Sequence, residues 1–318
     1  MKKIIRNVDE KRGIHQVTIA DERWYMKPSQ NPVSGTPEYQ AVPSVTWITQ
    51  SYPKGIGYFK WLAERGWDEA EGIKQIAGDK GTKVHLAIED VLNGKEVRID
   101  SKYPNKSSGQ MEELTLEECD AILSFIAWLK EQGLIKTLAT EITVFSVKNN
   151  YAGTVDWIVR IGDSFWIIDF KTSQFVWPSH EIQLNAYKQT IMNGENVVEG
   201  FPEGYDLSKI RMAILQVGYR KNKLGFKFTE IADDFDLFLT TQKIWKREHG
   251  GEMPNKKEYP IVLSPEVKKE VDQKVENAVV ETQKAFEAIV GTPEKTEVVS
   301  ENIGIDWGHS DGDKSVEL

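Results

Sequence analysis

The sequence Ser164-Phe165-Trp166-Ile167-Ile168-Asp169-Phe170-Lys171 is an apolar run that ends with an acid and a base. Bulky and β-branched residues over this length are typical of a buried strand. Asp156, at the end of Gly153-Thr154-Val155-Asp156, lies 13 residues upstream of Asp169, in a second apolar run. A charge beside a buried strand is costly unless it binds something. The two acids and Lys171 therefore predict a site for a divalent cation, a phosphate and a water.

Hydrophobic periodicity predicts an α/β fold around this site. Three strands are expected at 141–147, 153–161 and 164–170, and a tight turn at Gly162-Asp163 joins the last two. The core order is helix, three strands, helix, strand, which predicts a mixed sheet with helices packed on it. The other expected elements are a hairpin at 14–26, a loop at 27–43, a helix at 46–65 broken near Pro53, a helix at 80–93, a loop at 95–110, a helix opened by a capping box at 115–118, a helix at 179–193, strands at 211–219 and 224–231, and helices at 235–248 and 265–290. The helix after the capping box is expected to carry Leu116, Cys119, Leu123, Ile126 and Leu129 on one apolar side.

Composition limits the function classes. The chain of 318 residues has a formal charge of −9, which argues against a surface coated with Lys and Arg for tight nucleic-acid binding, but leaves room for a local basic groove. A single cysteine, Cys119, excludes an intramolecular disulfide and a four-cysteine metal site. The sequence has no run of 18 apolar residues, so no membrane span is expected. Its polar start argues against a secretory signal. We expect a cytoplasmic protein, or one in the host cytoplasm if a phage encodes it.

The acids and the lysine suit one kind of cation. Mg²⁺ and Mn²⁺ take hard oxygen ligands in octahedral geometry, and Asp156, Asp169 and the backbone carbonyl of Phe170 could supply them. Lys171 is two residues after Asp169, so strand alternation places both side chains on one face. Its ammonium could orient a water or neutralise phosphate charge. A surface salt bridge at a strand end is the alternative interpretation.

Further residues extend this pattern into a family signature. His85 stands in Gly81-Thr82-Lys83-Val84-His85, and Gln183 and Tyr187 are four residues apart on the helix that follows Lys171. The order Gly-Thr-x-Val-His, Gly-x-x-Asp, Asp-x-Lys-Thr-Ser and Gln-x-x-x-Tyr resembles the RecB-like branch of the PD-(D/E)XK nuclease superfamily over about residues 41–230. The opening Pro43-Ser44-Val45-Thr46 is typical of phage exonucleases and of the mitochondrial genome maintenance exonuclease.

The resemblance implies a fold and a set of roles. The fold would be a restriction-endonuclease-like core with N-terminal helical additions. His85, Asp156 and Asp169 would be metal ligands and Lys171 the catalytic lysine, while Gln183 and Tyr187 would contact DNA or position the lysine. Unlike the iron–sulfur members of the branch, this chain lacks four cysteines, and it has no Gly-x-x-x-x-Gly-Lys-Ser/Thr nucleotide loop.

Several neighbours of the site keep two interpretations each. Glu141 and Glu89 could join the metal site or be ordinary acids, and Thr172 and Ser173 are expected to shape the turn after the lysine. Tyr151 and Trp177 could stack on bases or pack in the protein. The aromatic and basic stretch from Trp47 to Arg65 could line a channel for single-stranded DNA or form a packed helical subdomain. Lys221, Lys223 and Lys227 are expected to be a solvated face, with phosphate contact as the alternative.

We therefore expect a Mg²⁺- or Mn²⁺-dependent exonuclease that hydrolyses DNA from ends or single strands in phage-type recombination, replication or repair. The alternatives are a structure-specific or flap endonuclease on the same core and a DNA-binding recombination accessory protein with little catalysis. DNA is the expected partner, with a recombination or single-strand-binding protein as a second and no membrane. The expected divisions are an N-terminal region at 1–80, a nuclease core at 81–250, a C-terminal helix at 251–291 and a disordered acidic tail at 292–318, in which seven acids face two lysines from residue 294 onward.

Overall fold

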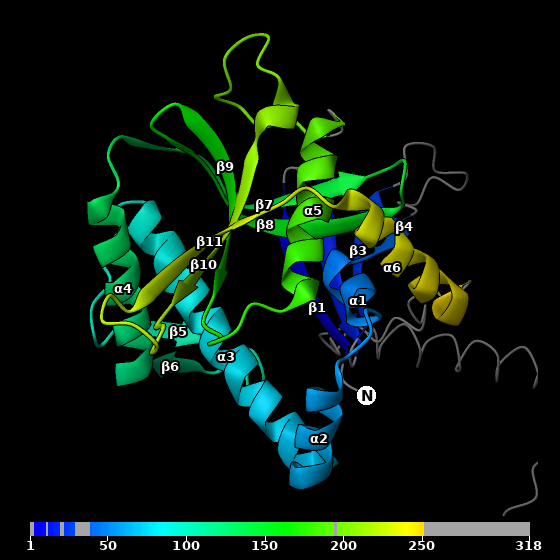
Figure 1. Cartoon of the computed structure of the whole chain (residues 1–318), viewed down its shortest axis with the longest axis horizontal. Helices are drawn as coiled ribbons and strands as arrows, with labels where there is room; N and C mark the ends of the chain where they lie inside the picture. Colours follow the sequence, from blue (N-terminus) through cyan, green and yellow to red (C-terminus); the bar gives the residue numbers. More distant parts are fainter. Residues whose placement is uncertain (1–2, 11, 20–21, 29–38, 194–195, 251–318) are drawn as a thin grey trace, which may run out of the picture. The chain divides into compact units, whose positions relative to one another are not determined.

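The computed structural model describes residues 3–10, 12–19, 22–28, 39–193 and 196–250 (Figure 1). Residues Met1–Lys256 form one compact unit, and the second unit, Lys257–Leu318, lies outside the described residues. The expected C-terminal helix and acidic tail therefore lie outside what the structure describes. The expected division at residue 80 falls inside one continuous helix.

The main sheet has five strands in the order β11-β10-β9-β8-β7. Its strands are β7 (Ile135–Ser146), β8 (Tyr151–Ile161), β9 (Ser164–Lys171), β10 (Arg211–Val217) and β11 (Phe226–Ile231). The β9–β10 pair is parallel and the other three pairs are antiparallel, so the predicted mixed sheet is confirmed. Gly162, with φ of +57°, makes the predicted turn between β8 and β9, where its positive φ costs a glycine little.

Helices cover both faces of this sheet. The helices are α1 (Val45–Gln50), α2 (Ile56–Arg65), α3 (Trp67–Leu92), α4 (Leu116–Glu131), α5 (Pro178–Met192) and α6 (Phe235–His249), with a 3₁₀ turn, η1, at Leu207–Lys209. Alternate residues of β9 enter two different cores: Phe165 and Ile167 pack with side chains of α1, α5 and α6, whereas Trp166 and Ile168 pack with those of α3 and α4. This two-sided burial explains why the strand is apolar throughout.

A second, antiparallel sheet precedes the helices. It has the order β1-β2-β3-β4, formed by β1 (Lys3–Asp9), β2 (Ile14–Ile19), β3 (Glu22–Pro28) and β4 (Tyr39–Pro43). The expected hairpin at 14–26 corresponds to β2 and β3. The sheet packs on β8, where the Tyr25 hydroxyl and Thr154 Oγ1 are 2.9 Å apart.

Some expected boundaries were wrong. The loops expected at 27–43 and 95–110 contain β4 and part of a small hairpin, whose strands are β5 (Lys102–Pro104) and β6 (Met111–Glu113). The helix expected to begin at residue 80 begins at Trp67, and β7 begins six residues before the expected start at residue 141. The polar first half of α3 and the bulged start of β7 both lack the apolar alternation that a sequence pattern needs.

The buried side of α4 also differs from expectation. The capping box at Thr115 and Glu118 is present, but Leu116 and Leu123 are exposed. The helix instead buries Ala121, Ile122, Phe125 and Trp128, which pack against the sheet. Cys119 is half-buried at the margin of this core. No helix in the described part of the chain is long and apolar enough to cross a membrane.

Candidate metal centre

Three acids stand in one row across neighbouring strands. Glu141 of β7 lies opposite Asp156 of β8, because the flanking pairs Thr140–Trp157 and Ile142–Val155 keep one register. Extending the Trp157–Ile168 pairing by one residue places Asp169 of β9 beside Asp156. The sequence prediction that Asp156 and Asp169 meet at adjacent strands is therefore supported by the register.

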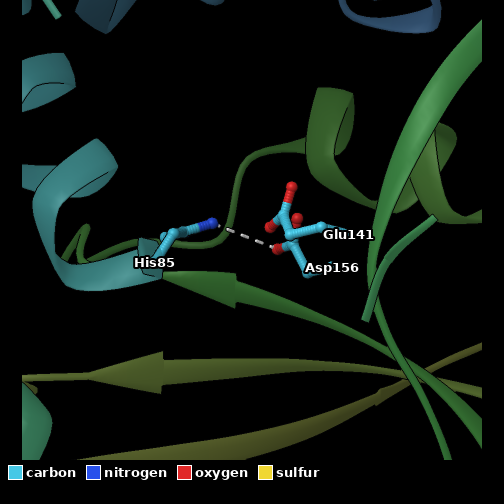
Figure 2. A group of neighbouring side chains, drawn as sticks. All are labelled: His85, Glu141 and Asp156. Carbon is cyan, nitrogen blue, oxygen red and sulfur yellow. Dashed lines mark ion pairs between the residues drawn. The ribbon is translucent and has the colours of Figure 1, made fainter. Parts of the chain in front are cut away.

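A histidine from α3 completes this group. Ligand atoms of His85, Glu141 and Asp156 all lie within 4.8 Å of one another, and their side chains point toward one another in Figure 2. His85 Nδ1 is 3.5 Å from Asp156 Oδ2, which also accepts a 2.8 Å hydrogen bond from the Phe170 backbone N–H. One nitrogen and several carboxylate oxygens are a donor set that suits a divalent cation.

Asp169 lies beside this group and is paired with Lys171. Lys171 Nζ is 2.5 Å from Asp169 Oδ2, and the Lys171 side chain is 18% exposed. Asp169 Oδ1 is buried and has no hydrogen-bond donor among the described residues. Such an orphaned buried oxygen is costly, and a cation or a donor group on a ligand would satisfy it.

The backbone of Glu141 is strained. Its φ is +47°, in the left-handed region that non-glycine residues seldom enter. This conformation costs about 1–3 kcal/mol and is tolerated where the surrounding structure requires it. Here the strain falls on the residue of β7 that faces the cluster.

Burial shifts the pKa values of this cluster in a consistent way. Burial raises the pKa of Asp156 and of Asp169 to about 6, although the Lys171 charge opposes both shifts. The pKa of Glu141 is raised well above its usual range by burial and by Asp156. Three acids with one cation are therefore short of positive charge, which a bound divalent cation would supply.

The pKa values of the two basic groups, His85 and Lys171, shift in opposite directions. Burial and the Lys171 charge lower the pKa of His85 to about 4, so its imidazole is neutral at pH 7 and has a lone pair to offer. Burial of Lys171 lowers its pKa, but Asp169 and Asp156 outweigh this and leave the Lys171 pKa above its ordinary value. Lys171 is therefore a fixed positive charge at neutral pH.

The expected motif residues of α5, Gln183 and Tyr187, pack against the strand that carries Asp156. Gln183 Nε2 donates a 2.8 Å hydrogen bond to the Tyr187 hydroxyl, and Tyr187 is buried. A Cβ added at Gly153 would lie 2.4 Å from Tyr187 Cε1, so the glycine of the Gly-x-x-Asp motif makes room for this ring. Tyr187 therefore offers no surface to a DNA strand and acts on the packing behind Asp156.

The turn after Lys171 contacts the glycine of the α3 motif. A Cβ at Gly81 would lie 3.6 Å from Thr172 Oγ1, which brings the Gly-Thr-x-Val-His and Asp-x-Lys-Thr motifs together. Ser173 Oγ donates to the Phe175 carbonyl at 2.8 Å, as expected of a residue that shapes the turn. Glu89, one helical turn after His85, is half-buried, and its charge raises the pKa of Glu141.

The aromatic residues that were expected near the site differ in their exposure to solvent. Tyr151 is fully buried and donates to the Ala186 carbonyl at 2.9 Å, so the base-stacking interpretation is wrong for it. Trp47 packs between Trp24 and Trp245, with ring centroids 4.9 Å and 4.8 Å away, and therefore does not line a channel. Trp177 and Phe59 are exposed.

Sequence reasoning missed His180, in the first turn of α5. Burial, then Lys171 and Lys54, lower its pKa to about 3. Its Nδ1 accepts a 3.4 Å hydrogen bond from the Trp177 backbone N–H. A histidine just after a Pro-initiated helix start was the available signal, and its closeness to Lys171 depends on the fold of the intervening loop.

No family model matches this sequence, and it has no match among curated proteins.

Proposed function

We propose that this protein is a divalent-metal-dependent DNA exonuclease of the PD-(D/E)XK superfamily, in its RecB-like, phage-type branch. The observation that carries the proposal is the His85–Glu141–Asp156 group beside the Asp169–Lys171 pair. Its support from the fold is the order α3, β7–β9, α5, β10, with β5, β6 and α4 inserted after α3.

Mg²⁺ or Mn²⁺ is the cofactor in this proposal. The orphaned Asp169 Oδ1 and the excess of acids over cations fit such an ion. His85, Glu141, Asp156 and Asp169 would hold it. The ion supplies a more acidic water and stabilises negative charge on the phosphate.

Each protein group then has a stated task in phosphodiester hydrolysis. Lys171, a fixed ammonium that remains partly accessible, orients the attacking water or neutralises a phosphate oxygen. The Phe170 N–H holds Asp156 Oδ2 in place, and the neutral His85 ring keeps a lone pair free. Gln183 and Tyr187 brace β8 at Gly153, three residues before Asp156.

The test is digestion of end-labelled linear and covalently closed circular single-stranded DNA, with Mg²⁺, Mn²⁺ or EDTA. We expect metal-dependent loss of the linear substrate alone. Lys171→Met, which keeps the apolar stem, and Asp169→Asn should each lower the rate by about 100-fold or more. Lys209→Met, at an exposed lysine of η1, is the matched control and should cleave as the wild type does.

The alternatives give different results in the same assay. Cutting of circles would replace the exonuclease with a structure-specific endonuclease. DNA binding without cleavage under every metal condition would reject the enzyme and support a recombination accessory protein. Full activity in Lys171→Met would remove the site assignment even if the protein cleaves DNA.

A further inference from the structure

Two exposed aromatic side chains stand on the loop that follows Lys171. Phe175 is 56% exposed and Trp177 is 53% exposed, and the loop carries the chain from the end of β9 to the start of α5. Their ring centroids are 5.8 Å apart with planes inclined by 40°, so neither ring fully covers the other. Single exposed aromatics are common on protein surfaces, but a pair within six residues of Lys171 is a more specific arrangement.

The loop backbone is held firmly while these two rings face solvent. Gln216 Nε2 of β10 donates to the Ser173 carbonyl at 2.7 Å. Both polar atoms of the Gln174 side-chain amide are hydrogen-bonded: its Nε2 donates to the Gly218 carbonyl at 2.9 Å and its Oε1 accepts from the Arg220 backbone N–H at 2.8 Å. The aromatic pair is therefore presented by a rigid support, which lowers the entropic cost of binding.

A lysine side chain lies over one of the two rings. Lys221 Nζ, from the turn between β10 and β11, is 3.8 Å from the Phe175 ring centroid. Lys54, which is exposed, and Lys171 both lower the pKa of His180, which follows Trp177 by three residues. Aromatic faces bordered by cations suit a ligand that has both flat rings and phosphates.

We propose that Phe175 and Trp177 form a platform on which unpaired bases of a single strand stack, next to the phosphate that enters the metal centre. This inference rests on the proposed function and adds the specificity-determining residues. In a duplex the faces of internal bases are covered by their neighbours, so a platform of this kind favours single strands and frayed ends. It is indifferent to sequence, because every base has a π face.

The test compares two probes of equal length and charge: fluorescently labelled oligothymidylate and the matching abasic sugar–phosphate strand. Binding is measured in Mg²⁺ with Lys171→Met as the common background, so that the probes stay intact. We expect this protein to bind the thymidylate about 5- to 100-fold more tightly than the abasic strand, and adding Trp177→Ala or Phe175→Ala to erase most of that preference. Adding Trp177→Phe should keep it.

The matched control is Trp67→Ala in the same background. Trp67 of α3 is also exposed and also has a lysine, Lys74, near its ring at 5.8 Å, so it tests whether any exposed tryptophan beside a cation gives the effect. We expect Trp67→Ala to leave the base preference unchanged. Thermal melting of each variant checks that the fold is intact.

The outcomes separate the two proposals. Equal affinity for the two probes, or an unchanged preference in Trp177→Ala and Phe175→Ala, would overturn the platform even if the wild type cleaves DNA. A preference that those two changes erase would support the platform even if the wild type cleaves nothing, in which case only the enzyme proposal fails. A loss of preference in Trp67→Ala as large as that in Trp177→Ala would also overturn it.

Discussion

At the scale of single residues, the centre is a place where burial and charge conflict. Glu141 shows this most clearly, because it is half-buried next to Asp156 and has a left-handed backbone. Local propensity opposes both features. The chain keeps an acid there at a cost in stability, which is the pattern expected where a residue serves binding and not folding.

Glu141→Gln tests that interpretation. The amide has the same shape and removes one acid from the cluster, so we expect a higher melting temperature for the metal-free protein at pH 7.5 and a smaller increase on adding Mn²⁺. The measurement is thermal unfolding with EDTA and with Mn²⁺. Glu131→Gln, at the exposed end of α4, is the control and should change neither value. An unchanged Mn²⁺ effect in Glu141→Gln would remove Glu141 from the metal site.

At the scale of elements, the centre depends on how α5 meets β8. The two are joined by a close approach in which the Tyr187 ring occupies the space where a Cβ at residue 153 would lie. The Gln183 hydrogen bond and the surrounding core hold the ring in place. The two sequence motifs that contain Gly153 and Tyr187 are thus halves of one packing contact.

Gly153→Ala should therefore destabilise the fold by about 1–3 kcal/mol, because the ring cannot move aside in a packed core. Chemical unfolding would measure the loss. Gly72→Ala is the matched control, because that glycine lies within α3 with no atom near its added Cβ, and it should gain about 0.5–1 kcal/mol. Equal effects of the two changes would show that the Tyr187 contact is not tight. Tyr187→Leu should restore part of the loss when combined with Gly153→Ala.

The orientation of α4 gives a second test at this scale. Ile122 is 4% exposed and Leu123 is 61% exposed, although the two side chains are adjacent and similar. Ile122→Ala should cost about 2–5 kcal/mol of unfolding free energy, whereas Leu123→Ala should change it by less than about 0.5 kcal/mol. Chemical denaturation of both variants checks this, and the reverse order would mean that α4 buries its other side.

At the scale of the whole molecule, protonation links the centre to pH. Asp156 and Asp169 bind protons more tightly in the folded state, with pKa values of about 6, so their contribution to stability is lost as pH rises from about 4 to about 6. His85 and His180 have pKa values lowered to about 4 and about 3, so their contribution increases with pH over a similar interval. Because these contributions oppose each other, the pH dependence of the metal-free protein's stability says little about the centre.

Metal-induced stabilisation is a sharper readout. A cation must displace the protons of Asp156, Asp169 and Glu141, so we expect Mn²⁺ affinity to weaken as pH falls through about 6, by up to about 10-fold per pH unit for each proton displaced. Melting temperatures at a series of Mn²⁺ concentrations between pH 5 and 8 measure this. A flat pH profile would place the metal away from these carboxylates.

The sequence alone determined which segments form the centre. Apolar runs interrupted by Asp156, Asp169 and Lys171 predicted the strands, their order and the mixed sheet, because burial on two faces leaves a period and a length that can be recognised in sequence. It placed His85 on a helix, and it placed Gln183 and Tyr187 one turn apart on another. It could not identify the buried face of α4, because two apolar stripes on one helix look alike without a partner.

Only the tertiary structure decided which side chains meet. The register of β7 with β8, set by a bulge at Leu138, brings Glu141 opposite Asp156. The three-residue cluster is His85, Glu141 and Asp156, with Asp169 paired to Lys171 beside it; the expected ligand set contained all four of these ligand residues and the Phe170 carbonyl. The same long-range packing buries Tyr151 and Trp47 and leaves Phe175 and Trp177 in solvent. The physical reason is that side-chain environment depends on contacts between residues far apart in the chain, which local propensity does not encode.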